Sequence, residues 1–373
     1  MLHVISGLGL GGAERSLYLI LKKCSVNPSL TTVITLTPGG YYCAKIKNLG
    51  VNVLELNLTN LFSVIFSTYK VIKLVRMLKF RVIQGWLNHG IFFASLLYFF
   101  SPKPTFLLWN IRQSMDALST MRLSTRVFFI INKFLSKAAD VIVFNSNYAC
   151  IQFNNYGYRG KSQKIIPNGI NFDNYIRSDV VRNNIRCNLD ISKETILIGH
   201  VARFDPMKDH LTFLRSAIHL LKNSPNIKFL LIGKGVDFNN SFFKNNIPLK
   251  IRKNFTLAGN QEKIQDYYQA MDMLCLTSIS EAFPNVLLEG VAFGLPCITT
   301  NVGDVESLIR DSDRIINSGD YNSLSREMKR LSLLSDTERN KIGAKDKSKA
   351  ISRFNINRVC NDYKEVIDYE RKL

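Results

Sequence analysis

The sequence predicts an α/β fold made of two doubly wound domains, each a parallel sheet wrapped by helices. Three observations support this fold class. The chain has 373 residues, which favours two domains of about 150 to 200 residues over one ordinary core. Short apolar runs rich in β-branched residues alternate with helix-length amphipathic segments. This alternation breaks and restarts at IPNGINFDNY, residues 166–175, whose Pro-Asn-Gly-Ile predicts a turn between domains.

The expected strands follow in chain order. The first half contains TTVITLT (31–37), RVIQGWL (81–87), TFLLWNI (105–111) and ADVIVFNS (139–146). The second half contains TILIGHVAR (195–203), KFLLIGKG (228–235), FTLAG (255–259), MLCLTS (273–278) and PCITTN (296–301). We therefore place one domain at 1–168, a second at 169–350, and a charged helix at 351–373 that returns to the first domain. A ligand cleft is expected between the carboxyl ends of the two sheets.

The sequence predicts a cytoplasmic protein. Its longest apolar stretch, IFFASLLYFF at 91–100, is half the roughly 20 residues that a transmembrane helix needs, so a buried helix is expected there. The first residues, MLHVISGLGLGG, lack a basic start and a cleavage site, and predict a strand entering a glycine loop. Seven dispersed cysteines without a C-x-x-C pair suit reduced core thiols. The five histidines are isolated from one another, so no metal site is expected.

Positive charge is concentrated in the first domain. Residues 1–168 carry 19 Lys and Arg against four Asp and Glu, a net charge of +15. Four cations recur at every third position of one expected helix: Lys70, Lys73, Arg76 and Lys79. Such a basic stripe suits the anionic inner face of the plasma membrane, with a peripherally bound protein; the alternative is a solvated helix face. Nucleic acid is not the expected partner, because no zinc finger, basic zipper or RNP-like segment is present.

The glycine loop near the N-terminus raises the question of a dinucleotide. Residues 7–12 contain G-x-G-x-x-G directly after an expected strand. That motif requires an acid after the second strand, but no acidic residue lies between Glu14 and Glu55. We therefore expect no nicotinamide or flavin cofactor. The same glycines let a helix that starts near Ala13 aim its free N–H groups at a bulky or anionic group.

A second cationic loop follows an expected strand in the second domain. The segment VARFDPMKDH, 201–210, holds Arg203 and Lys208 on either side of an Asp-Pro turn. Arginine binds a diphosphate bidentately and lysine binds it as a point charge, so this pair predicts one side of a nucleotide-diphosphate site.

These segments together resemble a known family. The chain is similar to retaining GT-B glycosyltransferases of the large bacterial group that includes sucrose synthases and phosphatidylinositol mannosyltransferases. The resemblance covers nearly the whole chain, through the following stretches: GLGLGGAERSL (7–17), QGWLNHG (84–90), LLWNIRQS (107–114), IPNGIN (166–171), VARFDPMKDH, LIGKG, LAGNQEKIQDYYQAMDMLCLTS, and SEAFPNVLLEGVAFGLPCITTNVG (280–303). The last stretch carries the family's E-x(7)-E signature, formed here by Glu281 and Glu289.

The resemblance implies roles for the residues of this signature. Pro284 would lie in the first turn of a helix that runs to about Phe293. The backbone N–H groups of Phe283 and Asn285 would then point at a phosphate or a sugar hydroxyl. In such enzymes Glu289 accepts both ribose hydroxyls of the nucleotide, and Glu281 lies beside the transferred sugar. Ala282 stands where many members have glycine, which makes the loop less free to adopt positive φ.

Further residues follow from the same resemblance. His89, expected at the end of a strand, would face the cleft near the donor sugar, and Arg112 and Ser114 would line the acceptor side. The implied reaction moves a sugar from a nucleotide diphosphate to an acceptor hydroxyl with retention. Gly11, Gly12, Arg203 and Lys208 would stabilise the departing diphosphate without a metal. Asp311-Ser-Asp313 matches the D-x-D of metal-dependent transferases but is interpreted as a surface loop.

Two alternatives remain open beside a glycosyltransferase of cell-surface polysaccharide or glycolipid synthesis. One is a nucleotide-sugar epimerase of the same fold. Unlike a transferase, it would not release free nucleotide only in the presence of an acceptor. The other is a non-catalytic basic protein of the membrane surface, against which the four residues Arg203, Lys208, Glu281 and Glu289 argue.

Overall fold

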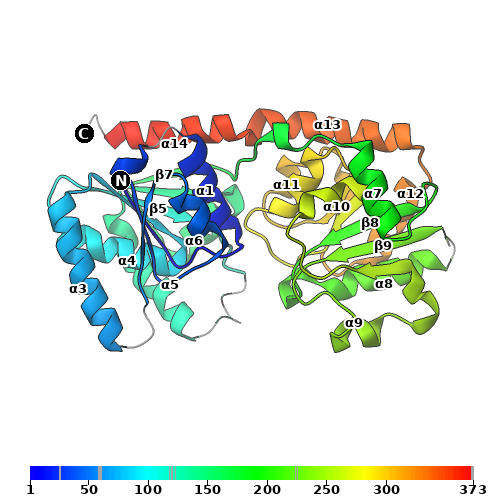
Figure 1. Cartoon of the computed structure of the whole chain (residues 1–373), viewed down its shortest axis with the longest axis horizontal. Helices are drawn as coiled ribbons and strands as arrows, with labels where there is room; N and C mark the ends of the chain where they lie inside the picture. Colours follow the sequence, from blue (N-terminus) through cyan, green and yellow to red (C-terminus); the bar gives the residue numbers. More distant parts are fainter. Residues whose placement is uncertain are drawn as a thin grey trace. The chain divides into compact units, whose positions relative to one another are not determined.

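The computed structural model describes residues 1–370, apart from residues 25, 26, 58–60, 117, 119, 120, 122, 223 and 225. The chain divides into two compact units. Unit 1 comprises Met1–Ile170 together with Phe354–Leu373, and unit 2 comprises Asn171–Arg353. Each unit is a parallel sheet covered by helices, so the α/β fold class predicted from the sequence is confirmed (Figure 1).

Unit 1 is built on a seven-stranded sheet in the order β3-β2-β1-β4-β5-β6-β7, with every pairing parallel. Its strands are β1 (Leu2–Ile5), β2 (Thr32–Thr35), β3 (Asn52–Glu55), β4 (Val82–Trp86), β5 (Phe106–Ile111), β6 (Val141–Phe144) and β7 (Ser162–Ile165). The strand order reverses between β1 and β4. The loops that follow these two strands therefore lie at the switch point, where doubly wound sheets bind their ligands.

The helices of unit 1 cover both faces of this sheet. They are α1 (Gly12–Lys23), α2 (Tyr41–Lys47), α3 (Leu61–Leu78), α4 (Leu87–Phe100), α5 (Leu123–Leu135), α6 (Asn147–Tyr156) and α14 (Ile356–Glu370), with short 3-10 turns η1 (Pro28–Leu30) and η3 (Ser136–Ala138). Crossovers between parallel strands are right-handed. Because the strands advance in opposite directions from the switch point, α1 and α2 lie on one face and α3 to α6 on the other.

The apolar stretch at 91–100 forms most of α4, which packs against β1, β4 and β5. Ile91, Ala94 and Leu97 are buried in this contact. The helix that was expected there is confirmed. Among the residues that the structure describes, no helix is both long and apolar enough to cross a membrane.

The C-terminal helix α14 completes the core of unit 1. Its residues Val359 and Tyr363 are buried in one cluster with Leu17 of α1 and with strand residues such as Val33 and Val143. The backbone of residue 170 is joined to this segment, since Ile170 N donates to Phe354 O at 3.0 Å. The final helix and the first 170 residues therefore share one core.

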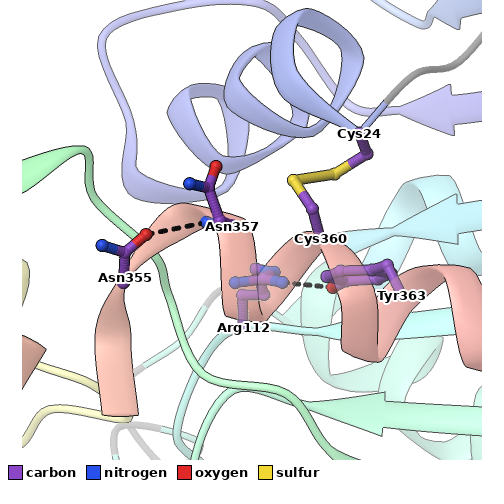
Figure 2. Close-up of a disulfide and its surroundings, with 6 residues drawn as sticks. All are labelled: Cys24, Arg112, Asn355, Asn357, Cys360 and Tyr363. Atoms are coloured by element: carbon purple, nitrogen blue, oxygen red, sulfur yellow. Dashed lines mark hydrogen bonds between the residues drawn. A yellow bond between two sulfur atoms is a disulfide. The ribbon is translucent and has the colours of Figure 1, made fainter. Parts of the chain in front are cut away.

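A disulfide joins Cys24, at the end of α1, to Cys360 of α14 (Figure 2). The expectation of reduced thiols is wrong for this pair. The two residues are 336 positions apart in sequence, and only the packing of α14 on α1 brings their Cα atoms to 4.9 Å. The remaining cysteines, which are 43, 150, 187, 275 and 297, are free thiols.

Unit 2 has a six-stranded parallel sheet in the order β10-β9-β8-β11-β12-β13. Its strands are β8 (Ile196–Val201), β9 (Ile227–Ile232), β10 (Phe255–Leu257), β11 (Met273–Leu276), β12 (Cys297–Thr300) and β13 (Ile315–Ile316). Here the order reverses between β8 and β11. The two loops that follow these strands hold the cationic segment and the E-x(7)-E segment, so the topology places both at one switch point.

The helices of unit 2 are α7 (Asp179–Asn188), α8 (His210–Leu221), α9 (Ser241–Asn246), α10 (Ile264–Ala270), α11 (Asn285–Ala292), α12 (Tyr321–Ser332) and α13 (Asp336–Phe354). Short 3-10 turns are η4 (Phe172–Asn174), η5 (Pro206–Lys208), η6 (Leu249–Asn254), η7 (Val305–Ser307) and η8 (Ser312–Arg314). The buried side chains of α8 and α12 pack with the sheet in one cluster that includes Phe213, Met328 and Phe229.

A buried ion pair holds the η8 turn, which leads into the last strand of unit 2, to α13. Asp346 is fully buried and accepts from both terminal nitrogens of Arg314, at 2.6 and 3.1 Å. The same carboxylate accepts from the backbone N–H of Arg310 at 3.1 Å, and Arg314 also donates to the carbonyl of Cys297. These hydrogen bonds compensate for removing both charges from water.

Candidate functional site

The loops after β8 and β11 are fastened to each other. Ile279 N donates to Met207 O at 2.8 Å, and the Thr277 hydroxyl donates to the carbonyls of Lys208 and Asp209, each at 3.0 Å. Asp209 itself caps α8 by accepting from Thr212 N. These backbone contacts fix the position from which the side chain of Lys208 extends.

Lys208 and Glu281 meet in this corner. The Lys208 ammonium forms a short ion pair with the Glu281 carboxylate, and both side chains are largely buried. The Ser278 hydroxyl donates to the same carboxylate oxygen at 2.8 Å. The structure thus joins a predicted diphosphate-binding cation to the predicted sugar-binding acid, although 73 residues separate them.

Arg203 lies in the same loop but points elsewhere. Its guanidinium is exposed and donates twice to Asp205 Oδ2, at 3.1 and 2.9 Å. Asp205 also accepts from Met207 N and so begins the η5 turn. Arg203 and Lys208 therefore share one loop, with only Lys208 in contact with Glu281.

Glu281 is followed by the tight entry into α11. Pro284 is the N-cap of this helix, one residue earlier than the first-turn position expected, and supplies no side-chain acceptor to the first turn. Ala282 and Phe283 are buried against the unit, and Gly303 approaches their loop with φ of +56°. A Cβ atom at Gly303 would lie 2.6 Å from the Glu281 carbonyl oxygen, so only glycine fits this approach without displacement.

Glu289 lies in the second turn of α11 and is buried. Its carboxylate accepts from the Tyr268 hydroxyl of α10 at 2.9 Å. The Tyr268 ring stacks on Phe293 at the end of α11, with centroids 5.8 Å apart. The packing of α10 against α11 therefore sets the orientation of the second acid of the signature.

Two of these partners, Ser278 and Tyr268, were missed in the sequence. Ser278 lies two residues after the apolar strand β11, and Tyr268 lies in an amphipathic helix. A hydroxyl at such positions is common, and no spacing rule marks it. A possible signal for Ser278 was its place three residues before Glu281 in the same loop.

In unit 1 the glycine loop and His89 follow β1 and β4, the two strands at the switch point. His89 is the third residue of α4, so the expectation that it ends a strand is wrong: β4 ends at Trp86. Leu87 makes the turn with φ of +58°, an unusual value for a residue with a side chain, and such strain is often kept at functional sites.

His89 is half-buried against Phe128, with ring centroids 4.6 Å apart, and burial lowers the pKa of its imidazole. The next residue, Gly90, brings α4 against β1, since a Cβ atom there would lie 2.6 Å from Val4 O. The neutral imidazole is therefore held in a fixed place after β4. Its predicted catalytic role remains a prediction.

Gly11 is the N-cap of α1, and Gly12 is the first residue of that helix. The carboxyl group of Glu14 lies directly against the Cα of Gly11, in the space that a side chain would occupy. Burial raises the pKa of this carboxyl. A side chain at position 11 would therefore have to displace the Glu14 carboxyl group, and the phosphate-facing role of Gly11 and Gly12 stays a prediction.

Arg112 is buried beneath α1 and α14. Its guanidinium donates to Asn110 Oδ1 at 3.0 Å and forms a short hydrogen bond with Asn168. A second short hydrogen bond joins it to the Tyr363 hydroxyl of α14 (Figure 2). These contacts give Arg112 a packing role in unit 1. Ser114 lies two residues further on and is partly exposed. The acceptor-side role of both residues remains a prediction.

Asp311 of the D-x-D segment forms a hydrogen bond and two ion pairs within unit 2. Asp311 caps η8 by accepting from Asp313 N at 3.1 Å. Its carboxylate also lies 3.5 Å from Arg314 and 3.6 Å from Arg330. These contacts account for Asp311 within the packing of unit 2.

Comparison with known proteins agrees with this geometry. Residues 181–349 match the model of a family described as "Glycosyl transferases group 1". An Escherichia coli protein, UDP-Gal:alpha-D-GlcNAc-diphosphoundecaprenol alpha-1,3-galactosyltransferase, is 24% identical over 209 residues, 54% of this chain and 53% of that protein. The putative glycosyltransferase EpsF of Bacillus subtilis is 27% identical over 137 residues, 37% of this chain and 35% of that protein. The chain thus aligns with about half or less of the length of these two relatives.

A solved structure extends the likeness to the whole chain. Anabaena Alr3699/HepE, crystallised in complex with UDP-glucose, superposes with a TM-score of 0.85 at 18% identity over 99% of both chains. At this identity the superposition establishes the fold. The fold is therefore GT-B, as the resemblance implied, and the match to the model of the glycosyl transferases group 1 family lies within unit 2.

Proposed function

We propose that this protein transfers a sugar from a nucleoside-diphosphate sugar to an acceptor hydroxyl with retention of the anomeric configuration. The observation that carries the proposal is the arrangement around α11: Glu281, bonded to Lys208, precedes the helix, and buried Glu289 lies within it. A cation, a helix N-terminus whose N-cap residue Pro284 supplies no side-chain acceptor, and two acids of different burial suit a leaving diphosphate, a sugar and a ribose.

In this scheme the enzyme acts mainly on the leaving group. As the bond between sugar and diphosphate breaks, negative charge grows on the phosphate oxygens. Lys208, Arg203 and the N–H groups at the start of α11 stabilise that charge. Glu281 faces the positive charge on the sugar, and Glu289 accepts the ribose hydroxyls.

The acceptor is proposed to be a growing polysaccharide or glycolipid. The E. coli relative is named for an acceptor carried on diphosphoundecaprenol, and the Anabaena structures hold UDP and UDP-glucose. We test the function with uridine, guanosine and adenosine diphosphate sugars, using GlcNAc-diphosphoundecaprenol as the first acceptor. Nucleotide release that requires the acceptor supports a transferase. A donor sugar that is converted without acceptor and without release of nucleotide supports the epimerase instead.

Transfer is expected to survive an excess of chelator, because cationic side chains and a helix N-terminus stabilise the diphosphate in the proposed scheme. Initial rates with and without the chelator should agree. A loss of rate that only a divalent cation restores would show that a metal takes part.

Glu289→Gln is expected to weaken binding of the nucleoside diphosphate by roughly 10- to 150-fold, because hydrogen bonds to a charged acceptor are worth about 1.5–3 kcal/mol. Titration calorimetry with the free diphosphate measures this loss. Tyr268→Phe should weaken binding less, since it removes only the partner that orients the carboxylate. Exposed Glu262→Gln is the matched control, and equal affinities for Glu289→Gln and this control would refute the ribose role.

A further inference from the structure

Three helices on one face of the unit 1 sheet form a continuous outer surface. Arg76 Nε of α3 donates to the carbonyl of Phe100 at the end of α4, at 3.2 Å. Asn88 of α4 donates to the carbonyl of Thr125 in α5, and Asn132 of α5 donates back to Asn88. The exposed side chains of α3, α4 and α5, with those of the residues directly after each helix, are called the α3–α5 face.

The α3–α5 face exposes an apolar stripe along the whole of α5. Leu123, Val127, Ile130 and Phe134 are 76%, 51%, 48% and 67% exposed. Their spacing of four, three and four residues places them on one side of the helix, while Phe129 on the opposite side is fully buried. A soluble surface helix normally turns such a stripe towards the core. Helix α5 therefore carries apolar side chains on its exposed side as well as on its buried side.

Large apolar side chains are also exposed where α3 and α4 end. They are Met77, Leu78, Phe99 and Phe100, exposed by 68%, 51%, 55% and 41%. All three helices run against the parallel strands, so their last turns lie at the same edge of the sheet. Phe134, in the last turn of α5, belongs to the same edge. The exposed apolar residues of the three helices thus form one patch rather than scattered positions.

The same face is strongly basic. Seven exposed cations lie on it: Lys70, Lys73, Arg76, Lys79, Lys103, Arg126 and Lys137. Neither Asp nor Glu occurs in α3, α4 or α5, and Asp116 is the sole acid between Glu55 and Asp140 in the sequence. Cations near helix C-termini complement the helix dipole, which accounts for those in the last turns. That effect does not account for Lys70 and Lys73, which lie before the last turn of α3, for Arg126 in the first turn of α5, or for the exposed apolar side chains.

We propose that the α3–α5 face docks on an anionic membrane surface, with the α5 stripe and the ends of α3 and α4 inserted among the acyl chains. Apolar side chains gain free energy by entering the interface, and flanking cations gain by meeting anionic headgroups. The surface was expected from charge alone to be a basic stripe on one helix. The structure adds eight exposed apolar side chains and two more helices.

The charge pattern selects this occupant over a second copy of the chain. A twofold interface would bring the same seven cations of two molecules together with no acid on the helices to pair with them. Docking is independent of the proposed function, because it needs neither donor nor acceptor. Its test and the transfer assay can therefore fail separately.

Flotation of the full chain with vesicles tests the proposal. The protein is expected to bind vesicles of phosphatidylcholine that contain about 30% phosphatidylglycerol, an anionic lipid, and not vesicles of phosphatidylcholine alone. The triple variant Lys70→Gln/Lys73→Gln/Lys79→Gln should bind about 100-fold more weakly, since each cation near the surface contributes roughly fivefold. The variant Val127→Ser/Ile130→Ser/Phe134→Ser should lose the binding that survives in high salt, where charge is screened.

A matched control removes exposed apolar residues from unit 2. Val180→Ser/Leu333→Ser deletes two side chains that are 69% and 76% exposed, and should float like the unchanged protein. Insertion is read from Phe134→Trp, because Trp86 and Trp109, the two tryptophans of the chain, are fully buried and give a constant background. Its emission should shift to the blue on anionic vesicles, whereas that of Leu333→Trp should not.

Three outcomes overturn the proposal. One is equal flotation with neutral and anionic vesicles. Another is unchanged binding in both the charge and the apolar variants. The third is a dimer in solution that the apolar variant makes monomeric while neither protein binds vesicles, which would assign the face to self-association.

Discussion

Glu281→Gln is expected to lower turnover about 100- to 1,000-fold, the loss typical of removing one electrostatic contact to a transition state. The substituted amide keeps the shape of the side chain but no longer opposes the positive charge that develops on the sugar. Affinity for the free nucleoside diphosphate should not weaken, because the Lys208 ammonium remains in place and loses a competing partner. Steady-state kinetics with donor and acceptor, together with calorimetry on the diphosphate, separate the two quantities.

The control for this substitution is Glu306→Gln, which neutralises an exposed acid of the same unit and should leave both quantities unchanged. If Glu281→Gln weakens diphosphate binding as much as Glu289→Gln does, the two acids do not divide sugar and ribose between them. A normal turnover number in Glu281→Gln would remove this residue from the catalytic scheme altogether.

Asp346→Ala is expected to destabilise unit 2 by about 3–5 kcal/mol, because it removes the buried counter-ion of Arg314 and leaves this guanidinium with the partly exposed Asp311 carboxylate, 3.5 Å away. Denaturation followed by circular dichroism measures the loss. Both tryptophans lie in unit 1, so their fluorescence follows that unit separately. The unfolding transition of unit 2, which circular dichroism detects and tryptophan fluorescence does not, should shift to a lower denaturant concentration.

Two further variants give this prediction its control. Lys341→Ala removes an exposed cation from the same helix and should stay within about 0.5 kcal/mol of the unchanged protein. The double replacement Arg314→Met/Asp346→Leu should recover much of the loss, since apolar residues of similar volume often replace a buried pair at little cost. A single variant as stable as the control would show that the pair contributes nothing net.

The central strands could be predicted from the sequence. Buried parallel strands are continuous apolar runs, and the runs at 105–111 and 273–278 contain β5 and β11 almost to the residue. The edge strands β3 and β7 were not singled out. Their residues are half exposed, so Asn52–Glu55 and Ser162–Ile165 show no such run, and they become strands only by pairing with a neighbour.

The two acids of the candidate site could be predicted from the sequence, but the contacts that their side chains make could not. The spacing of Glu281 and Glu289 is a local pattern, and the sequence shows it directly. The pairing of Glu281 with Lys208 depends on β8 and β11 being neighbours in the sheet, which no local pattern reveals. The return of the last helix to the first domain was predicted, but no local pattern reveals that it packs on α1, and the Cys24–Cys360 disulfide was therefore not foreseen.

Unit 1 is formed by two separate segments of the chain, and this sets the order in which the units finish folding during synthesis. Unit 2 is one uninterrupted segment, Asn171–Arg353, so it can fold on the ribosome as soon as that segment has emerged. Unit 1 begins first but lacks Val359, Cys360 and Tyr363 of its core until α14 has been translated. The nascent chain therefore carries an unfinished N-terminal sheet, with the apolar surface of α1 uncovered by α14, throughout the synthesis of unit 2. A chaperone that binds exposed apolar surface would find its substrate in this interval.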